Sequence, residues 1–130
     1  TTNNFPKNKK TYIPPPQQDL PILQKATAAY LLWHECLPRL PRLTRFTLGS
    51  KIDRLYLETI EYMLIAGYTA RERKLVIVQQ ASAKLDTLKF FLKIAWQAKA
   101  LSPKKYAELS APVAEIGKML GGWHKQLTSE

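Results

Sequence analysis

The side chains that most often carry out chemistry are few in this chain and poorly placed for it. The sequence contains two histidines and one cysteine, and the densest group of potential ligands is His34, Glu35 and Cys36. Neighbouring residues of a helix point about 100° apart, so these three side chains cannot converge on one metal ion. His124 lies in a separate segment. We therefore predict no metal site, and an enzymatic or ligand-binding site near His34 and Glu35 is the weakest functional alternative.

Motifs of catalysis and phosphate binding are missing from the sequence. It contains no glycine-rich phosphate loop and no HExxH motif. No Ser, His and Asp residues lie within the local sequence motifs that surround a catalytic triad. The internal carboxylates worth noting are Glu58, Glu61 and Glu115. We expect them to pair with arginines of the bundle such as Arg54 or Arg45, because a half-buried charge needs a partner. The sequence therefore predicts a protein that is not an enzyme and requires no cofactor.

Positive charge is the dominant property of the chain. Twenty Lys and Arg against ten Asp and Glu give a net charge of +10, which favours an anionic partner, most often nucleic acid. The charge is uneven: residues 70–101 carry seven cations and two acids, net +5. The segments 1–20 and 21–69 each carry +2, and residues 102–130 carry +1.

The cations fall into two clusters joined by a row of lysines. Three arginines spaced three residues apart follow the first apolar segment, and three further cations crowd the expected start of the third helix, where they oppose the helix dipole. Such a surface suits phosphate backbones and gives salt-sensitive binding with little sequence preference. The candidate nucleic-acid-binding residues are Arg39, Arg42, Arg45, Arg71, Arg73, Lys74, Lys84, Lys89 and Lys93.

Four helices must position these residues, because apolar side chains recur at helical spacing in four segments and strand patterns are almost absent. We expect helices at about Pro21–Cys36, Phe46–Gly67 and Ala70–Ala100, and a fourth that starts at Pro103 behind the cap Ser102 and ends at Gly121-Gly122. Short connections predict an all-α, antiparallel up-down four-helix bundle. Its expected core residues are Leu23, Ala26, Tyr30, Trp33, Leu48, Ile52, Leu55, Thr59, Met63, Ala66, Leu75, Val78, Leu85, Leu88, Leu92, Ala95, Tyr106, Leu109, Val113, Ile116 and Leu120.

The basic stretch between the first two helices, LPRLPRLTRFTLGSKIDR, is predicted to be a structured helix entry rather than a linker. Its prolines stop the first helix. Phe46, Leu48 and Ile52 are expected to hold it on the core, and Asp53 to pair with an arginine. Gly49 is expected to allow close packing, at a cost of about 1 kcal/mol in helix propensity.

Residues 1–19 differ in composition from the rest of the chain. They are rich in Asn, Lys and Pro, and we predict a disordered tail attached to a bundle domain at 20–127. No apolar run reaches the ~18–20 residues of a membrane span. One cysteine and no recognisable leader predict a cytoplasmic protein.

A second apolar stripe runs along the second and third helices, nearly opposite the core stripe. A helix of a monomeric bundle needs only one buried face, so a second stripe indicates a contact with another copy of the chain. The alternative is a tilted helix that its own bundle wraps more fully. The candidate oligomer-interface residues are Val76, Ala83, Phe90, Ile94, Leu57, Ile60 and Leu64.

Two motifs and the segment between them resemble a known family. RFTLGSKID at 45–53 and EIGKMLGGW at 115–123, with LDTLKFFLKIAWQAKALSPKKYAELS at 85–110, resemble the small four-helix-bundle proteins related to the ribosomal-RNA intervening-sequence proteins. Within that group the chain is most similar to the Avd (accessory variability determinant) proteins of diversity-generating retroelements. The resemblance covers about residues 20–127, and the proline-rich tail is not part of the expected pattern.

The resemblance implies a specific function. Avd proteins are pentameric barrels of four-helix bundles, supply no catalytic residues, bind RNA and DNA, and associate with the reverse transcriptase of a bacterial or phage-encoded retroelement. We therefore expect a homopentamer that partners a reverse transcriptase and RNA, DNA or an RNA/DNA hybrid in mutagenic cDNA synthesis. The alternative is a sister member of the bundle family with a structural or ribosomal-RNA-associated role outside any retroelement.

Overall fold

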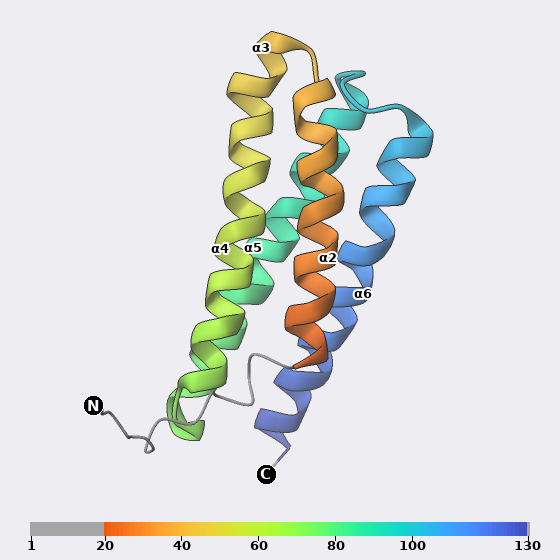
Figure 1. Ribbon diagram of the computed structural model, residues 1–130. Helices are drawn as coiled ribbons and strands as arrows, with labels where there is room; N and C mark the ends of the chain where they lie inside the picture. The colour runs from red at the N-terminus through yellow and green to blue at the C-terminus, as the bar shows by residue number, and fades with distance from the viewer. Residues whose placement is uncertain (1–19, 130) are drawn as a thin grey trace, which may run out of the picture.

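The computed structural model describes residues 20–129 of the chain. Four long helices run side by side in alternating directions: α2 (Pro21–Cys36), α4 (Ser50–Tyr68), α5 (Arg71–Gln97) and α6 (Pro103–Thr128) (Figure 1). Three short helical turns, η3 (Leu37–Arg39), α3 (Arg42–Thr44) and η4 (Arg45–Gly49), lead from α2 into α4. Within residues 20–129 the structure is helical apart from short connections, with no strand, and the prediction of an all-α antiparallel bundle is confirmed. The predicted tail, residues 1–19, lies outside the described residues.

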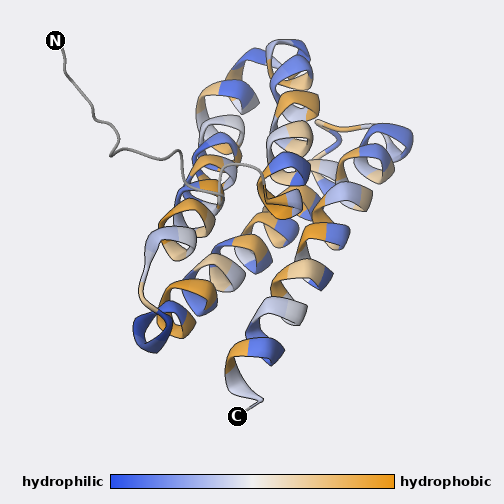
Figure 2. Cartoon of the chain, turned by 60° about the horizontal axis from the view of Figure 1, so that its bottom comes forward, coloured by the Kyte–Doolittle hydropathy of each residue, from blue (hydrophilic) through white to orange (hydrophobic). Residues whose placement is uncertain are grey.

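The four helices close into a ring around one core. Helix α5 packs against α4 and α6, and α2 packs against the same two helices from the other side. Apolar and hydrophilic residues alternate along every helix in Figure 2, as expected for helices with one buried face. Trp33, Ile52, Met63, Val78 and Val113 are fully buried. Burial of each large apolar side chain contributes about 1.5–3 kcal/mol, so this core holds the helices together.

Most of the predicted core is confirmed, with a few positions nearer the surface. The side chains of Tyr30, Leu48, Leu75 and Tyr106 are half-buried rather than buried. Tyr30 and Tyr106 place polar hydroxyl groups at the edge of the core, where tyrosine is commonly found. The hydroxyl of Thr59 is buried and donates to the Leu55 carbonyl at 2.7 Å, which satisfies it within the helix.

Helix α5 ends three residues before the predicted boundary. Lys99 adopts a left-handed backbone with φ of 65°. The amide of Ala100 donates to the Ala95 carbonyl at 2.9 Å and that of Lys99 to Trp96 at 2.9 Å, which is the Schellman pattern of a helix end. The restart at α6 follows the prediction, because the Ser102 hydroxyl accepts from the Lys105 amide at 3.0 Å.

The prediction that the fourth helix ends at Gly121-Gly122 is wrong, since α6 continues to Thr128. Both glycines face open space. Beyond them, Trp123 and Leu127 pack against the core and are half-buried. Each glycine costs about 1 kcal/mol of helix propensity, and the apolar contacts of the following turn offset that cost.

The basic stretch between α2 and α4 is a structured helix entry, as predicted. A Cβ on Gly49 would lie 3.0 Å from Leu37 Cδ1 and 3.1 Å from Leu40 Cδ1, so the close packing expected there is confirmed. Gly49 closes the π turn η4. Ile52 is buried, but Phe46 is exposed and does not hold the stretch on the core. The wider i→i+5 turn shifts the helical register, which takes Phe46 out of the core stripe.

Candidate nucleic-acid interface

The structure separates the two predicted cation clusters to opposite ends of the bundle. Arg39, Arg42 and Arg45 lie in the turns at one end, at the top of Figure 1. Arg71 and Arg73 lie at the start of α5, at the other end. In an up-down bundle this separation follows from the alternating helix directions, because the first and third connections share an end and the second connection occupies the other.

The arginines of the first cluster have different roles. Arg39 and Arg42 are exposed and can reach a partner. Arg45 is half-buried, and its Nη2 donates to the carbonyls of Pro38 at 3.0 Å and Leu40 at 3.2 Å. These bonds hold the turn in place, so Arg45 is a structural residue of the end rather than one of its open cations.

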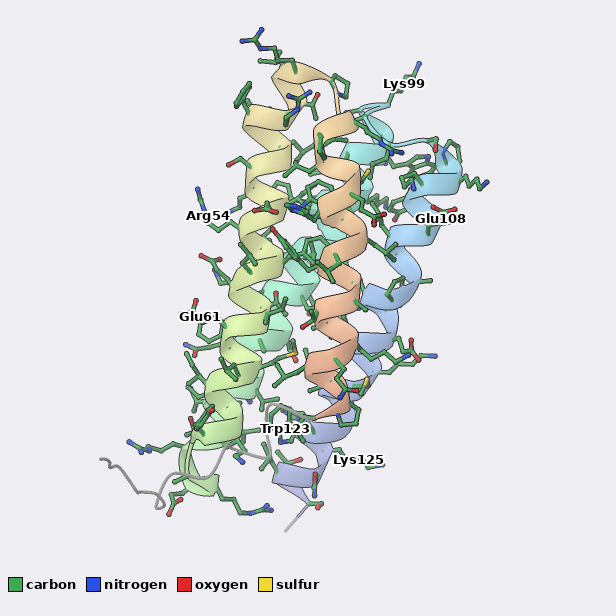
Figure 3. The ribbon with its side chains drawn as sticks, viewed as in Figure 1. Arg54, Glu61, Lys99, Glu108, Trp123 and Lys125 are labelled. Atoms are coloured by element: carbon green, nitrogen blue, oxygen red, sulfur yellow. The ribbon has the colours of Figure 1, made fainter. Side chains whose placement is uncertain are left out.

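Three further lysines, which were not predicted, add positive charge to this end. Lys99 lies in the α5–α6 connection, and Lys104 and Lys105 lie in the first turn of α6, where they oppose the helix dipole. Figure 3 shows Lys99 pointing outward from this end. Lys105 contacts Glu108 at 3.0 Å, and this hydrogen bond lowers the pKa of the Glu108 carboxyl. Lys104 and Lys105 follow Pro103 directly in sequence, so cations near a helix start were a signal that could have identified them.

At the opposite end, the start of α5 meets the last turns of α6. Arg71 Nη2 lies 3.4 Å from the Gln126 carbonyl oxygen, to which it donates. Lys74 Nζ lies 5.9 Å from the centre of the Trp123 ring, within the range of a cation–π contact. Arg73 is exposed. Lys125 lies on the outer side of α6 at the same end and was not predicted (Figure 3).

The predicted row of lysines along α5 is partly neutralised. Lys84 pairs with Glu58 of α4 at 3.1 Å. Lys89 approaches Asp86 at 3.9 Å, a long contact between exposed groups that contributes little. Lys93 is exposed. The row therefore connects the two ends with less charge than its three lysines suggest.

The carboxylates have partners other than those predicted. Glu58 pairs with Lys84, and Glu115 pairs with Lys25 at 2.9 Å, so the expected arginine partners of these two are wrong. Asp53 accepts a hydrogen bond from Trp33 Nε1 at 3.1 Å. The contact joins α2 to α4 across the core.

The second apolar stripe lies on the outer face of α4 and α5. Val76 and Phe90 are 57% and 60% exposed, and Leu57 and Leu64 are 46% and 37% exposed. Ala83 is exposed as well, whereas Ile60 and Ile94 are half-buried. The bundle itself therefore leaves most of the stripe uncovered, which argues against the alternative of a more fully wrapped helix. Ile65 and Tyr68 of α4 are further exposed apolar side chains on the same helix.

The remaining reactive side chains do not form a site. His34 and Glu35 are exposed, and the His34 ring lies 5.8 Å from that of Tyr30. Cys36 is buried, and burial raises the pKa of its thiol, which disfavours the nucleophilic thiolate. Within residues 20–129, no three His, Cys, Asp or Glu side chains gather as they would around a metal ion. No helix of this part of the chain has the length and apolar character needed to cross a bilayer.

These features define a small, basic, helical-bundle protein with cations at both ends and an exposed apolar face. The family model described as bAvd-like matches residues 20–127, a span that contains all four long helices. The chain belongs to the bAvd-like family, whose members are accessory, non-catalytic proteins of the Avd type. No curated protein matches the sequence.

Proposed function

We propose that this protein is the accessory subunit of a diversity-generating retroelement. In this role it is an oligomeric, basic, cytoplasmic scaffold that binds a reverse transcriptase and its template RNA or cDNA and supports mutagenic reverse transcription. The observation that carries the proposal is that one face of the bundle is apolar and exposed while cations occupy both ends of the same helices. Membership of the bAvd-like family supports it.

Assembly through the outer face of α4 and α5 follows from the exposed stripe. Phe90 and Val76 lie on one side of α5, and Leu57 and Leu64 lie on one side of α4. Large apolar side chains that remain exposed along two neighbouring helices favour a contact with another copy of the chain. The resemblance to Avd proteins leads us to propose five copies in a closed ring.

A ring of subunits would repeat each basic end around its rim. Exposed Arg39, Arg42, Arg73 and Lys99 would then form two rings of positive charge. Phosphate backbones bind such rings by releasing counterions, so the affinity falls steeply as salt rises. Two separated rings also allow one scaffold to hold a template and a polymerase at the same time.

The test is cDNA synthesis by the reconstituted reverse transcriptase with its template RNA. Replacement of Arg71, Arg73 and Lys74 by Ala should abolish or strongly reduce the product. A matched variant, in which the exposed Lys51, Arg54 and Lys118 are replaced by Ala, removes the same charge away from the start of α5. It should retain most of the activity.

Equal activity of the two variants and the unaltered protein would refute a role for the basic end of α5. Equal loss in both would show that total charge matters and that position does not. Salt-dependent binding of ribosomal RNA together with no effect on any reverse transcriptase would favour the alternative role outside a retroelement.

A further inference from the structure

A groove opens at the end of the bundle where α2 and α5 begin and α6 ends. Its volume is about 550 Å³, and its lining includes Ile22, Arg71, Lys74, Met119, Trp123 and Gln126. This volume lies within the ~300–1,000 Å³ of small-molecule sites. Figure 3 shows Trp123 between the lower ends of the helices. The match to the bAvd-like family assigns no residue to this groove.

The lining combines an apolar, aromatic floor with a cationic wall. Ile22 is buried, and Met119 and Trp123 are half-buried against the core, so the floor is held rigidly. Arg71 and Lys74 supply positive charge, and none of the ten lining residues is acidic. Such a groove complements a ligand that joins a flat apolar body to an anionic group.

We propose that the groove binds one unpaired nucleotide of a nucleic-acid strand, with its base against Trp123 and its phosphate at Lys74 and Arg71. The inference rests on the proposed function and names the form of nucleic acid that this end selects. Aromatic side chains beside cations are the usual means of holding unpaired bases, because stacking needs a free base face and a duplex offers none along its length.

The position of Lys74 fits this role. Its ammonium group lies 5.9 Å from the centre of the Trp123 ring, so a base at that ring brings its own phosphate near the ammonium. The lysine stem is flexible and can leave the ring face to meet the phosphate. Gln126 lines the same groove, and its side-chain amide can both donate to and accept from a base edge.

The charge of the groove argues against the nearest competing occupant. Residues 1–19 directly precede Leu20, which borders the groove. That segment carries three lysines and one aspartate, a net charge of +2. A cationic wall disfavours a cationic segment and favours a phosphate.

Fluorine NMR of the full chain labelled with 5-fluorotryptophan tests the proposal. The three tryptophans give three signals, and replacement of each in turn assigns them. Addition of a six-residue RNA without base pairing should shift the Trp123 signal to saturation. The signal of Trp33, which is fully buried in the core, should not move. Inorganic phosphate at equal ionic strength should move neither.

Affinity measurements complete the test. Trp123→Leu keeps an apolar side chain and all the charge, so it should weaken hexanucleotide binding about tenfold, the effect of one lost stacking contact. Binding of a duplex of equal length should change less than twofold. The matched variant Trp96→Leu should change neither affinity.

Each remaining outcome overturns the proposal. If the hexanucleotide binds while the Trp123 signal stays fixed, nucleic acid is held by surface cations alone, and only the groove assignment fails. If an acidic peptide moves the signal and the hexanucleotide does not, the groove binds a protein. If no nucleic acid binds at all, the proposed function fails together with the groove.

Discussion

Replacement of Phe90 by Lys should dissociate the oligomer without unfolding the subunit. Phe90 lies on the outer face of α5 and is 60% exposed. A phenylalanine buries roughly 150–250 Å² when covered, so a contact over the exposed part removes about 90–150 Å² from water. At ~25 cal/mol per Å² this corresponds to about 2–4 kcal/mol for each Phe90 that is covered.

The expected change in association is therefore large and measurable. Loss of 2 kcal/mol or more weakens an interface by about thirtyfold, at roughly 1.4 kcal/mol per factor of ten. Sedimentation velocity over a range of concentrations should show smaller species for Phe90→Lys than for the unaltered protein. The midpoint of thermal unfolding of the isolated subunit should hardly move, because exposed substitutions usually change stability by less than about 0.5 kcal/mol.

A matched variant separates the interface from surface hydrophobicity in general. Leu31 of α2 is 54% exposed and lies on the helix diagonally opposite α5. Leu31→Lys introduces the same charge and should leave the assembly intact. If Phe90→Lys sediments like the unaltered oligomer, or if Leu31→Lys dissociates it equally, the reasoning about the outer face of α4 and α5 is refuted.

Three further predictions concern stability and reactivity. Gly49→Ala should destabilise the fold by about 1–3 kcal/mol in urea unfolding, because the new Cβ would crowd two leucine side chains at 3.0 and 3.1 Å. The control Gly121→Ala, in open space within a helix, should stabilise the fold by about 0.5–1 kcal/mol. If Gly121→Ala were the more destabilising of the two substitutions, the close packing at Gly49 would be contradicted. Asp53→Ala should lower the free energy of unfolding by about 1–3 kcal/mol, because the buried Trp33 N–H loses its acceptor. Asp53→Asn keeps an acceptor and should lower it by less. Equal losses in the two variants would show that the carboxylate charge matters instead. The Cys36 thiol is buried, so it should react with a disulfide reagent only as fast as the chain opens, and rapid labelling of the folded chain would contradict its burial. Burial also raises the pKa of this thiol. The free energy of unfolding should therefore fall as the pH rises through about 9.0, where the thiol of the unfolded chain ionises.

The bundle could be predicted from sequence because it depends on local patterns. Apolar spacing and the caps at Ser102 and Pro103 fix the helices, and these signals act within a few residues. The end of α6 could not be predicted in this way. Gly121-Gly122 is a strong local stop signal, and only the tertiary packing of Trp123 and Leu127 overrides it.

The positive charge of the candidate site could be predicted from sequence, but the contacts of its individual side chains could not. The sequence showed which cations exist, and the up-down topology placed them at two ends. It could not show that Arg45 is held by the carbonyls of its own turn, nor that Glu58 meets Lys84, since both contacts depend on the relative rotation of packed elements. The groove beside Trp123 required the continuation of α6, which the glycine signal had hidden.

The mass of the particle in solution, measured by light scattering, shows directly whether the chain is an oligomeric scaffold that holds nucleic acid through its charge. At low salt we expect five times the 14.9 kDa subunit mass and a larger particle when a structured RNA is added. At high salt the RNA should be lost while the protein assembly stays intact. A 14.9 kDa monomer that ignores RNA at every salt concentration would contradict this role.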